Sequence, residues 1–140
     1  MISLRLVIDT NIIVSAALKP AGQQRTVVLL AITKPARLYV SDPIPAEYGE
    51  VLSRLELKIR QGLQRQLIGL IGRHSHPVNP SRHFHVAQDP DDDIFLECAD
   101  AARADYLVTG NQRPFPRFWK QTKVVTSREL LGIVAPHLIS

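Results

Sequence analysis

At 140 residues, 45% of them hydrophobic and 21% charged, the chain has the size and composition of one globular domain, which we expect to span residues 1–140. It has no apolar run near the ~20 residues that cross a bilayer, no secretion signal at its N-terminus and one cysteine, Cys98, so we expect a cytoplasmic protein without an internal disulfide. The net charge of +4 favours an anionic partner, while acids crowded into residues 89–93 leave room for an acidic pocket with basic margins.

Short β-rich runs alternate with longer helical patterns, which predicts parallel strands joined by crossover helices in an α/β fold. The expected elements, in chain order, are a strand at 4–8, helices at 11–18 and 24–33, a strand ending near residue 41, helices at 43–55 and 61–73, a helix from residue 90, strands at 106–109 and 123–126, and a helix at 127–135. Asp42 and Asp89 are expected N-caps, because a proline follows each of them at the first helical position. Residues 74–88 are irregular, and we expect one short strand around 83–86.

Three of the predicted strands end in small polar or acidic residues, in VID-TN, YVS-D and LVT-GN. Ligands of open parallel sheets sit at the carboxyl ends of the strands, so Asp9 and Asn111 are candidate neighbours at one edge. Glu47 and Asp92 lie in the first turns of two helices and can point toward the same edge. Asp9 by itself permits two interpretations, a helix cap or a member of a cation site, because a buried carboxylate is unfavourable without a partner.

Carboxylates gathered at one edge repel each other and raise each other's pKa unless a cation neutralises them. A cluster with oxygen ligands and no His or Cys favours Mg²⁺ or Mn²⁺. Such an ion lowers the pKa of a water molecule and orients it for in-line attack on phosphorus, which is the chemistry of phosphodiester hydrolysis. The acids at 89–93 have an alternative explanation, since helix capping and the helix dipole favour them without any metal.

Four motifs carry a resemblance to a known family: VIDTNIIVSA from residue 7, PAEYGEVLSR from 45, DPDDDIFLECA from 89 and ADYLVTGN from 104. In this order they resemble the PIN-domain family, specifically its bacterial toxin-like (VapC-like) branch. The resemblance implies a Rossmann-like three-layer sandwich around a central, mostly parallel sheet. It also implies Mg²⁺- or Mn²⁺-dependent ribonuclease activity on RNA, homodimers or higher homo-oligomers, and often a cognate antitoxin that blocks the site.

The family pattern, matched one residue at a time, places its first aspartate on Asp9, its glutamate on Glu47 and its third acid on Asp92, which are the implied metal ligands. Many relatives carry a further aspartate in the fourth motif, where this chain has Asn111. An amide oxygen can coordinate a metal or hold its water but brings no negative charge, so Asn111 joins the implied catalytic set with its role as a ligand left open. The supporting residues are Thr10, Asn11, Asp93 and Thr109.

Asp93 rivals Asp92 for the third position, because three consecutive aspartates blur the register. We prefer Asp92, since Phe95, Leu96 and Ala99 then follow it at three, four and seven residues, as in the family pattern.

The leading hypothesis is therefore a metal-dependent endoribonuclease, the toxin component of a type II toxin–antitoxin pair. Its rival, motivated by Asn111 and Pro114, is a catalytically degenerate module that binds an antitoxin or RNA without cleavage. A phosphatase with an aspartate nucleophile ranks lower, because it needs a second aspartate where this chain has Asn11. The stretch NQRPFPRFWK suits stacking on unpaired bases, but packing of its aromatic residues against the sheet is the preferred interpretation. Two histidine pairs, at 74 and 76 and at 83 and 85, have a spacing that could bind zinc. Because they lack a companion cysteine or a helical His-x-x-x-His pattern, we assign them surface or structural roles.

Overall fold

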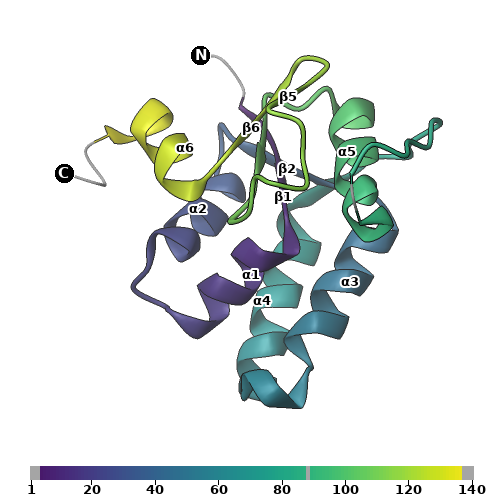
Figure 1. Ribbon diagram of the computed structural model, residues 1–140. Coiled ribbons are helices and arrows are strands. Elements are labelled where there is room, and N and C mark those ends of the chain that lie inside the picture. The colour runs from purple at the N-terminus through teal and green to yellow at the C-terminus, as the bar shows by residue number, and fades with distance from the viewer. Residues whose placement is uncertain (1–3, 88, 137–140) are drawn as a thin grey trace.

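A six-stranded sheet with the order β3-β2-β1-β4-β6-β5 forms the centre of the computed structural model, which describes residues 4–87 and 89–136 (Figure 1). Its strands are β1 Arg5–Ile8, β2 Arg37–Val40, β3 Ser75–Pro77, β4 Tyr106–Val108, β5 Phe118–Trp119 and β6 Thr122–Val125. The first five strands of this spatial order pair in parallel, and β5 runs antiparallel to β6 at the edge. The predicted α/β fold with a mostly parallel sheet is confirmed.

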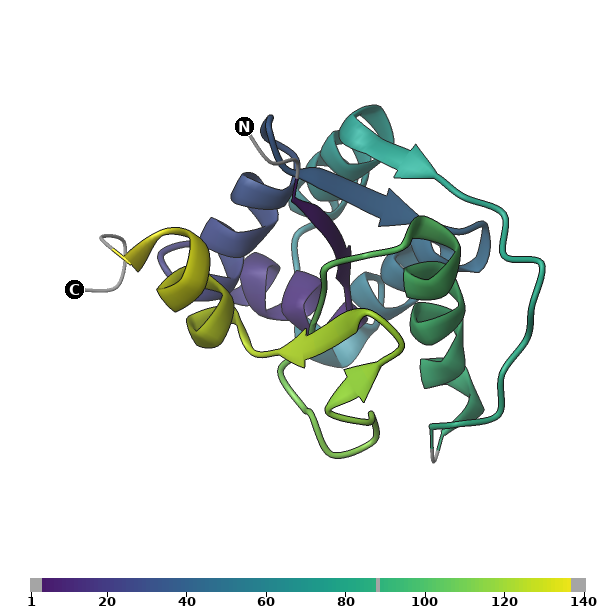
Figure 2. The same ribbon diagram turned by 90° about the horizontal axis from the view of Figure 1, so that it is seen from above.

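Helices cover both faces of this sheet, so that three layers result. They are α1 Thr10–Leu18, α2 Gln23–Ala31, α3 Pro43–Leu52, α4 Gln61–His74, α5 Pro90–Ala102 and α6 Ser127–Val134, with a 3₁₀ turn, η1, at Leu55–Leu57. Figure 2 shows α2 and α6 on one side of β1 and α5 on the other. Central strand β1 is accordingly apolar on both faces, with Leu6, Val7 and Ile8 fully buried. Among the described residues no helix is both long and apolar enough to cross a lipid bilayer.

The prediction of a strand around residues 83–86 is wrong. Those residues adopt no regular secondary structure, and the edge strand β3 forms earlier, at Ser75–Pro77, directly after α4. β3 pairs in parallel with β2, with Leu38 opposite Ser75 and Val40 opposite Pro77. Pro77 lacks an N–H group and is tolerated because β3 has a neighbour on one side only.

Helix α3 differs from its prediction at both ends. It stops at Leu52 rather than at Leu55, because the Ser53 hydroxyl donates to the carbonyl oxygen of Glu50 (2.8 Å) and Arg54 turns to an extended backbone. Asp42 occupies the N-cap position but makes no side-chain cap hydrogen bond. The prolines at 43 and 45 leave few free N–H groups in the first turn of α3, so the predicted cap at Asp42 does not form. The predicted cap of α5 is confirmed, because the Asp89 carboxylate accepts the N–H of Asp91 (3.0 Å).

Strand β5 was not predicted, and it explains where the aromatic residues of NQRPFPRFWK lie. Phe115 is buried, and the Trp119 indole N–H donates to the carbonyl oxygen of Leu96 (3.0 Å), so both side chains pack against the fold as preferred from the sequence. Phe118 is the exception, because it is 60% exposed on the antiparallel edge.

Candidate functional site

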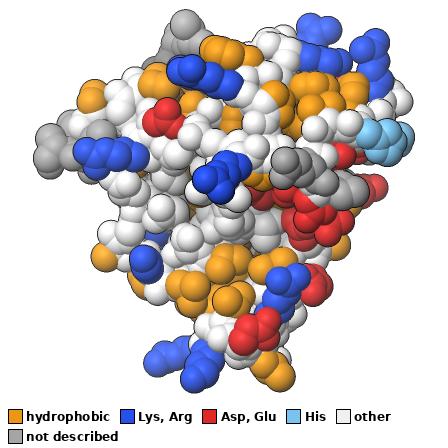
Figure 3. Space-filling view, in the orientation of Figure 1, with side chains coloured by type: hydrophobic (Ala, Val, Ile, Leu, Met, Phe, Trp, Pro, Cys, Tyr) orange, Lys and Arg blue, Asp and Glu red, His pale blue; other side chains and the backbone are white. Residues whose placement is uncertain are grey.

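A cleft of about 510 Å³ opens at the carboxyl ends of β1 and β4, where α3 and α5 begin. Its acidic lining residues are Asp9, Glu47, Glu56, Asp89, Asp91 and Asp92. Figure 3 shows acidic side chains gathered beside the lower end of α5. A larger cavity, of about 640 Å³, lies between α2 and α6. Its lining is mostly apolar, with Thr26, Thr33 and Lys34 but no carboxylate, so chemistry rather than volume identifies the candidate site.

Asp9 belongs to the cleft and caps a helix at the same time. It follows β1, and only 6% of its surface is exposed. Its Oδ1 accepts the N–H of Thr10 (2.7 Å) at the start of α1, and its Oδ2 accepts the hydroxyl of Thr109 (2.7 Å), which follows β4. Burial raises the pKa of Asp9, and these two hydrogen bonds oppose the rise. The helix-cap interpretation is therefore confirmed, and Asp9 also lines the cleft, while its membership of a cation site stays a prediction.

Glu47 is held against Asp9 by two contacts that cross from α3 to β1 and α1. The hydroxyl of Thr10 donates to Oε2 of Glu47, and the hydroxyl of the buried Tyr48 donates to the carbonyl oxygen of Ile8. Burial raises the pKa of Glu47, and the charge of Asp9 adds to the rise, while the Thr10 hydroxyl opposes it. Tyr48, which the sequence analysis did not single out, thus fixes the turn that carries Glu47 to the end of the strand that carries Asp9.

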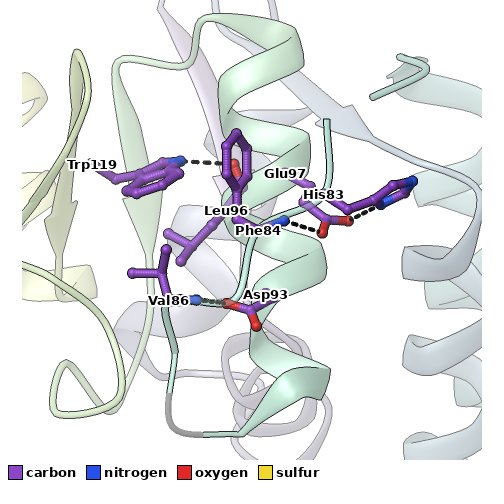
Figure 4. A network of polar contacts seen from close by, with 7 residues as sticks. All are labelled: His83, Phe84, Val86, Asp93, Leu96, Glu97 and Trp119. Atoms are coloured by element: carbon purple, nitrogen blue, oxygen red, sulfur yellow. Dashed lines mark hydrogen bonds and ion pairs between the residues drawn. The ribbon is translucent and has the colours of Figure 1, made fainter. Parts of the chain in front are cut away.

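Asp92 and Asp93 point to different places. Asp92 is half-buried, lines the cleft and has no hydrogen-bond partner among the described residues. Burial, together with the charges of Asp9, Asp89, Glu47 and Asp91, raises its pKa to about 6. Asp93 is 4% exposed and does not line the cleft. Its Oδ1 accepts the N–H of Val86 (3.1 Å; Figure 4) and also the N–H of Ala87 (2.8 Å).

The polar residues after β4 are tied to α1. The Oδ1 of Asn11 accepts the N–H of Gly110 (2.9 Å), and its Nδ2 lies 3.4 Å from the Thr109 hydroxyl, which also receives the N–H of Asn111 (3.1 Å). A side chain on Gly110 would bring its Cβ to 3.4 Å from the Asn11 oxygen, so the loop approaches α1 closely here. The Asn111 side chain lies at the cleft, exposed, with its Oδ1 accepting the N–H of Arg113 (3.3 Å).

The donor chemistry of the cleft fits a hard divalent cation. Asp9, Glu47 and Asp92 come from three separate elements and offer only oxygen atoms, the ligands that Mg²⁺ and Mn²⁺ prefer. Burial raises the pKa of all three carboxyl groups, and neighbouring negative charges add to the rise for Glu47 and Asp92. Within residues 4–87 and 89–136 no three His, Cys, Asp or Glu side chains stand close enough together to hold an ion as they are placed.

Arg54 and the acids beside Asp92 are further cleft residues that the sequence analysis did not assign to the site. Arg54 lines the cleft and pairs with Glu50 (3.1 Å) at the surface. Asp89 was expected as a helix cap and Asp91 as a first-turn acid favoured by the helix dipole, and neither was named as a site residue, yet both line the cleft and raise the pKa of Asp92. The run of acids was the available signal, but its spacing does not show which members face inward.

Comparisons with known proteins agree with this architecture. A sequence profile of the PIN domain matches residues 5–113. The uncharacterized protein MJ1680 of Methanocaldococcus jannaschii is 27% identical over 114 residues, which cover 79% of this chain and 73% of that protein. Among solved structures, a chain of VapBC2 from Rickettsia felis, crystallised bound to a DNA fragment from their promoter, superimposes with a TM-score of 0.60 at 17% identity, over 88% of this chain and 98% of that one. This last likeness shows the fold.

Proposed function

Because the chain belongs to the PIN domain family, we propose that it is a metal-dependent endoribonuclease, the toxin component of a type II toxin–antitoxin pair. The observation that carries the proposal is the convergence of Asp9, Glu47 and Asp92 on one cleft, where burial, together with the charges of Asp9 and Glu47, raises the pKa of Asp92. A residue that served only packing at position 92 would favour stability by losing this charge, because burial and the neighbouring carboxylates oppose ionisation there. Their presence is explained by a bound cation.

Asp9, Glu47 and Asp92 would hold Mg²⁺ or Mn²⁺. When bound, such an ion activates water for attack on a phosphodiester and offsets the charge that develops on the phosphate. Asp9 is the most fixed of the three, because the N–H of Thr10 and the hydroxyl of Thr109 each hold one of its oxygens. Thr10 also holds Glu47, so this threonine joins two of the three carboxylates.

Other residues of the cleft serve the substrate and the fixed carboxylates. Asn11 and Thr109 bond to each other and to the loop after β4, which supports a role in orienting Asp9 rather than in touching RNA. Asn111 lies at the cleft without charge and is proposed to orient water or substrate. Arg54, at the cleft and exposed, offers a guanidinium to a substrate phosphate.

The proposed partners follow from the same assignment. RNA is the substrate, a cognate antitoxin covers the cleft, and the chain forms a homodimer or a higher homo-oligomer in the cytoplasm, where its substrate lies. The solved neighbour with a TM-score of 0.60 comes from a VapBC2 assembly, which supports the antitoxin proposal.

A second candidate, a PIN-like module that binds an antitoxin or RNA without cleavage, is favoured by two observations. Asn111 supplies no negative charge in the fourth motif, and among the residues that the structure describes the carboxylates do not stand close enough together to enclose an ion. Tight RNA binding without divalent-dependent cleavage would support this candidate.

The deciding experiment is cleavage of single-stranded RNA by the purified chain with Mg²⁺, with Mn²⁺ and with a chelator. We expect cleavage only with a divalent ion, and loss of cleavage in Asp9→Asn, Glu47→Gln and Asp92→Asn. Asp42→Asn is a matched control, because Asp42 is an exposed carboxylate at the start of the helix that carries Glu47 and makes no cap bond. Full cleavage by Asp9→Asn and Asp92→Asn would refute the assignment.

A further inference from the structure

The segment 83–87, here called the strap, lies along α5 and is held by two acids of that helix (Figure 4). Glu97 accepts the N–H of Phe84 (2.9 Å) on Oε2, and its Oε1 lies 3.2 Å from Nδ1 of His83. Asp93, one helical turn earlier, accepts two backbone N–H groups on a single oxygen, from Val86 at 3.1 Å and from Ala87 at 2.8 Å. These side chains replace the strand neighbour that the strap lacks.

The other side of the strap is closed by the hairpin of β5 and β6. The ring of Phe84 meets the ring of Trp119 edge to face at a centroid distance of 4.8 Å, and Trp119 bonds to Leu96 of α5. Lys120 places its Nζ 4.6 Å from the Phe84 ring centre and 3.1 Å from the carboxylate of Asp100. The upstream part of the strap is therefore anchored by several independent contacts.

The downstream part depends on Asp93. The strap leads toward Asp89, whose carboxylate caps α5 through the N–H of Asp91 and which lines the cleft together with Asp91 and Asp92. Asp93 is the acid that ties this end of the strap to the helix, and it is 4% exposed. A carboxylate suits this position, because the first turn of a helix favours negative charge and one oxygen can accept two N–H groups.

We propose that Asp93 is a positioning residue, a main-chain clamp that fixes the strap to α5 and thereby holds Asp89 and Asp92 in the cleft, and that it is not itself a cation ligand. The inference rests on the proposed function in one respect, the role of Asp92 as a ligand. It assigns different roles to two adjacent aspartates. Asp92 lines the cleft and has no hydrogen-bond partner within the described part of the chain, whereas Asp93 accepts the N–H groups of Val86 and Ala87 on the strap.

Three variants separate a clamp from a ligand. D93N keeps an Oδ1 that accepts both N–H groups but removes the charge that a ligand needs, D93A removes the acceptor, and D92N removes the proposed ligand. We expect D93N to retain Mn²⁺ affinity, measured by calorimetry, and RNA cleavage near the wild-type level. D93A should lower both by about 10- to 100-fold, as loss of a group that orients a ligand does, and D92N should abolish both. E97A is the control for a loosened strap, and we expect it to leave both values unchanged.

The clamp is overturned if D93N falls to the level of D92N, because Asp93 would then act as a ligand, or if D93A matches wild type. D93N against D92N decides the question even where D93A does not fold.

Amide hydrogen exchange followed by NMR tests the clamp without any activity. In D93A the amides of Val86, Ala87 and Asp91 should exchange faster than in wild type, whereas E97A should expose Phe84 and leave Asp91 protected. If wild type neither binds Mn²⁺ nor cuts RNA but these amides respond as expected, the proposed function fails and the clamp stands. Unchanged amide exchange at Asp91 in D93A would refute the clamp and leave the proposed function unaffected.

Discussion

Replacing Thr109 by valine removes one hydroxyl and almost no volume, so it isolates the hydrogen bond to Asp9. Thr109 is fully buried and its Oγ1 lies 2.7 Å from the Oδ2 of Asp9, which is itself 6% exposed. A buried hydrogen bond to a charged group contributes about 1.5–3 kcal/mol. The N–H of Asn111 also loses its acceptor, so we expect the free energy of unfolding to fall by an amount within this range when Asp9 is ionised.

The pH dependence distinguishes this loss from ordinary damage to packing. Burial raises the pKa of Asp9 and the hydroxyl lowers it, so Thr109→Val raises that pKa further and leaves the ionised form with the N–H of Thr10 as its remaining hydrogen-bond donor among the described residues. The destabilisation should be full well above the folded-state pKa of Asp9 and should shrink as the pH falls below it. Thr109→Ser is the control: it keeps the hydroxyl and loses one buried methyl group, which costs about 1 kcal/mol at every pH.

Urea unfolding of both variants over a pH series from about 8 down to about 3 measures these differences, because the linear extrapolation returns each free energy of unfolding. Mn²⁺ titration should also show an affinity loss of about 10- to 100-fold for Thr109→Val and a smaller one for Thr109→Ser. A loss of stability for Thr109→Val that stays constant over the whole pH series would refute the reasoning.

Three further predictions use other parts of the structure. Asp92 has a folded-state pKa of about 6 against an ordinary value of 3.8, so the free energy of unfolding falls as the pH rises through about 6. Asp92→Asn should therefore raise the urea midpoint at about pH 8 in the absence of metal. An unchanged midpoint would contradict this prediction. Thr126 and Glu129 form a capping box at α6, so Thr126→Ala should cost about 1 kcal/mol in urea unfolding while the exposed Arg128→Ala costs little. Cys98 is buried with its pKa raised to about 12, so iodoacetamide should label it only after unfolding, and rapid labelling of the folded chain would contradict its placement.

Local patterns predicted most of the fold, and they failed where a distant partner decided the conformation. The run RLYV and the helix GLQRQLIGLIGR carry their periodicity in their own residues, and both elements formed close to their expected bounds. The segment 83–86 has the composition of a strand, yet its N–H groups bond to side chains of α5 that come later in the chain. The residues of the segment alone therefore do not indicate that side chains of α5 take the place of a neighbouring strand.

The sequence by itself determined which residues are chemically able to form the site. The order of strands and helices and the apolar residues before Asp9 and Thr109 place polar groups at one edge of a parallel sheet, because strand ends share that edge.

Only the tertiary structure decided how the site is assembled. It set Asp92 in the cleft and turned Asp93 to the strap, since a helix rotates its side chains by about 100° per residue and the packing of α5 selects the face. It also joined Asp9 to Thr109 and Tyr48 to Ile8, contacts between residues far apart in the chain that exist only after the sheet has closed around them.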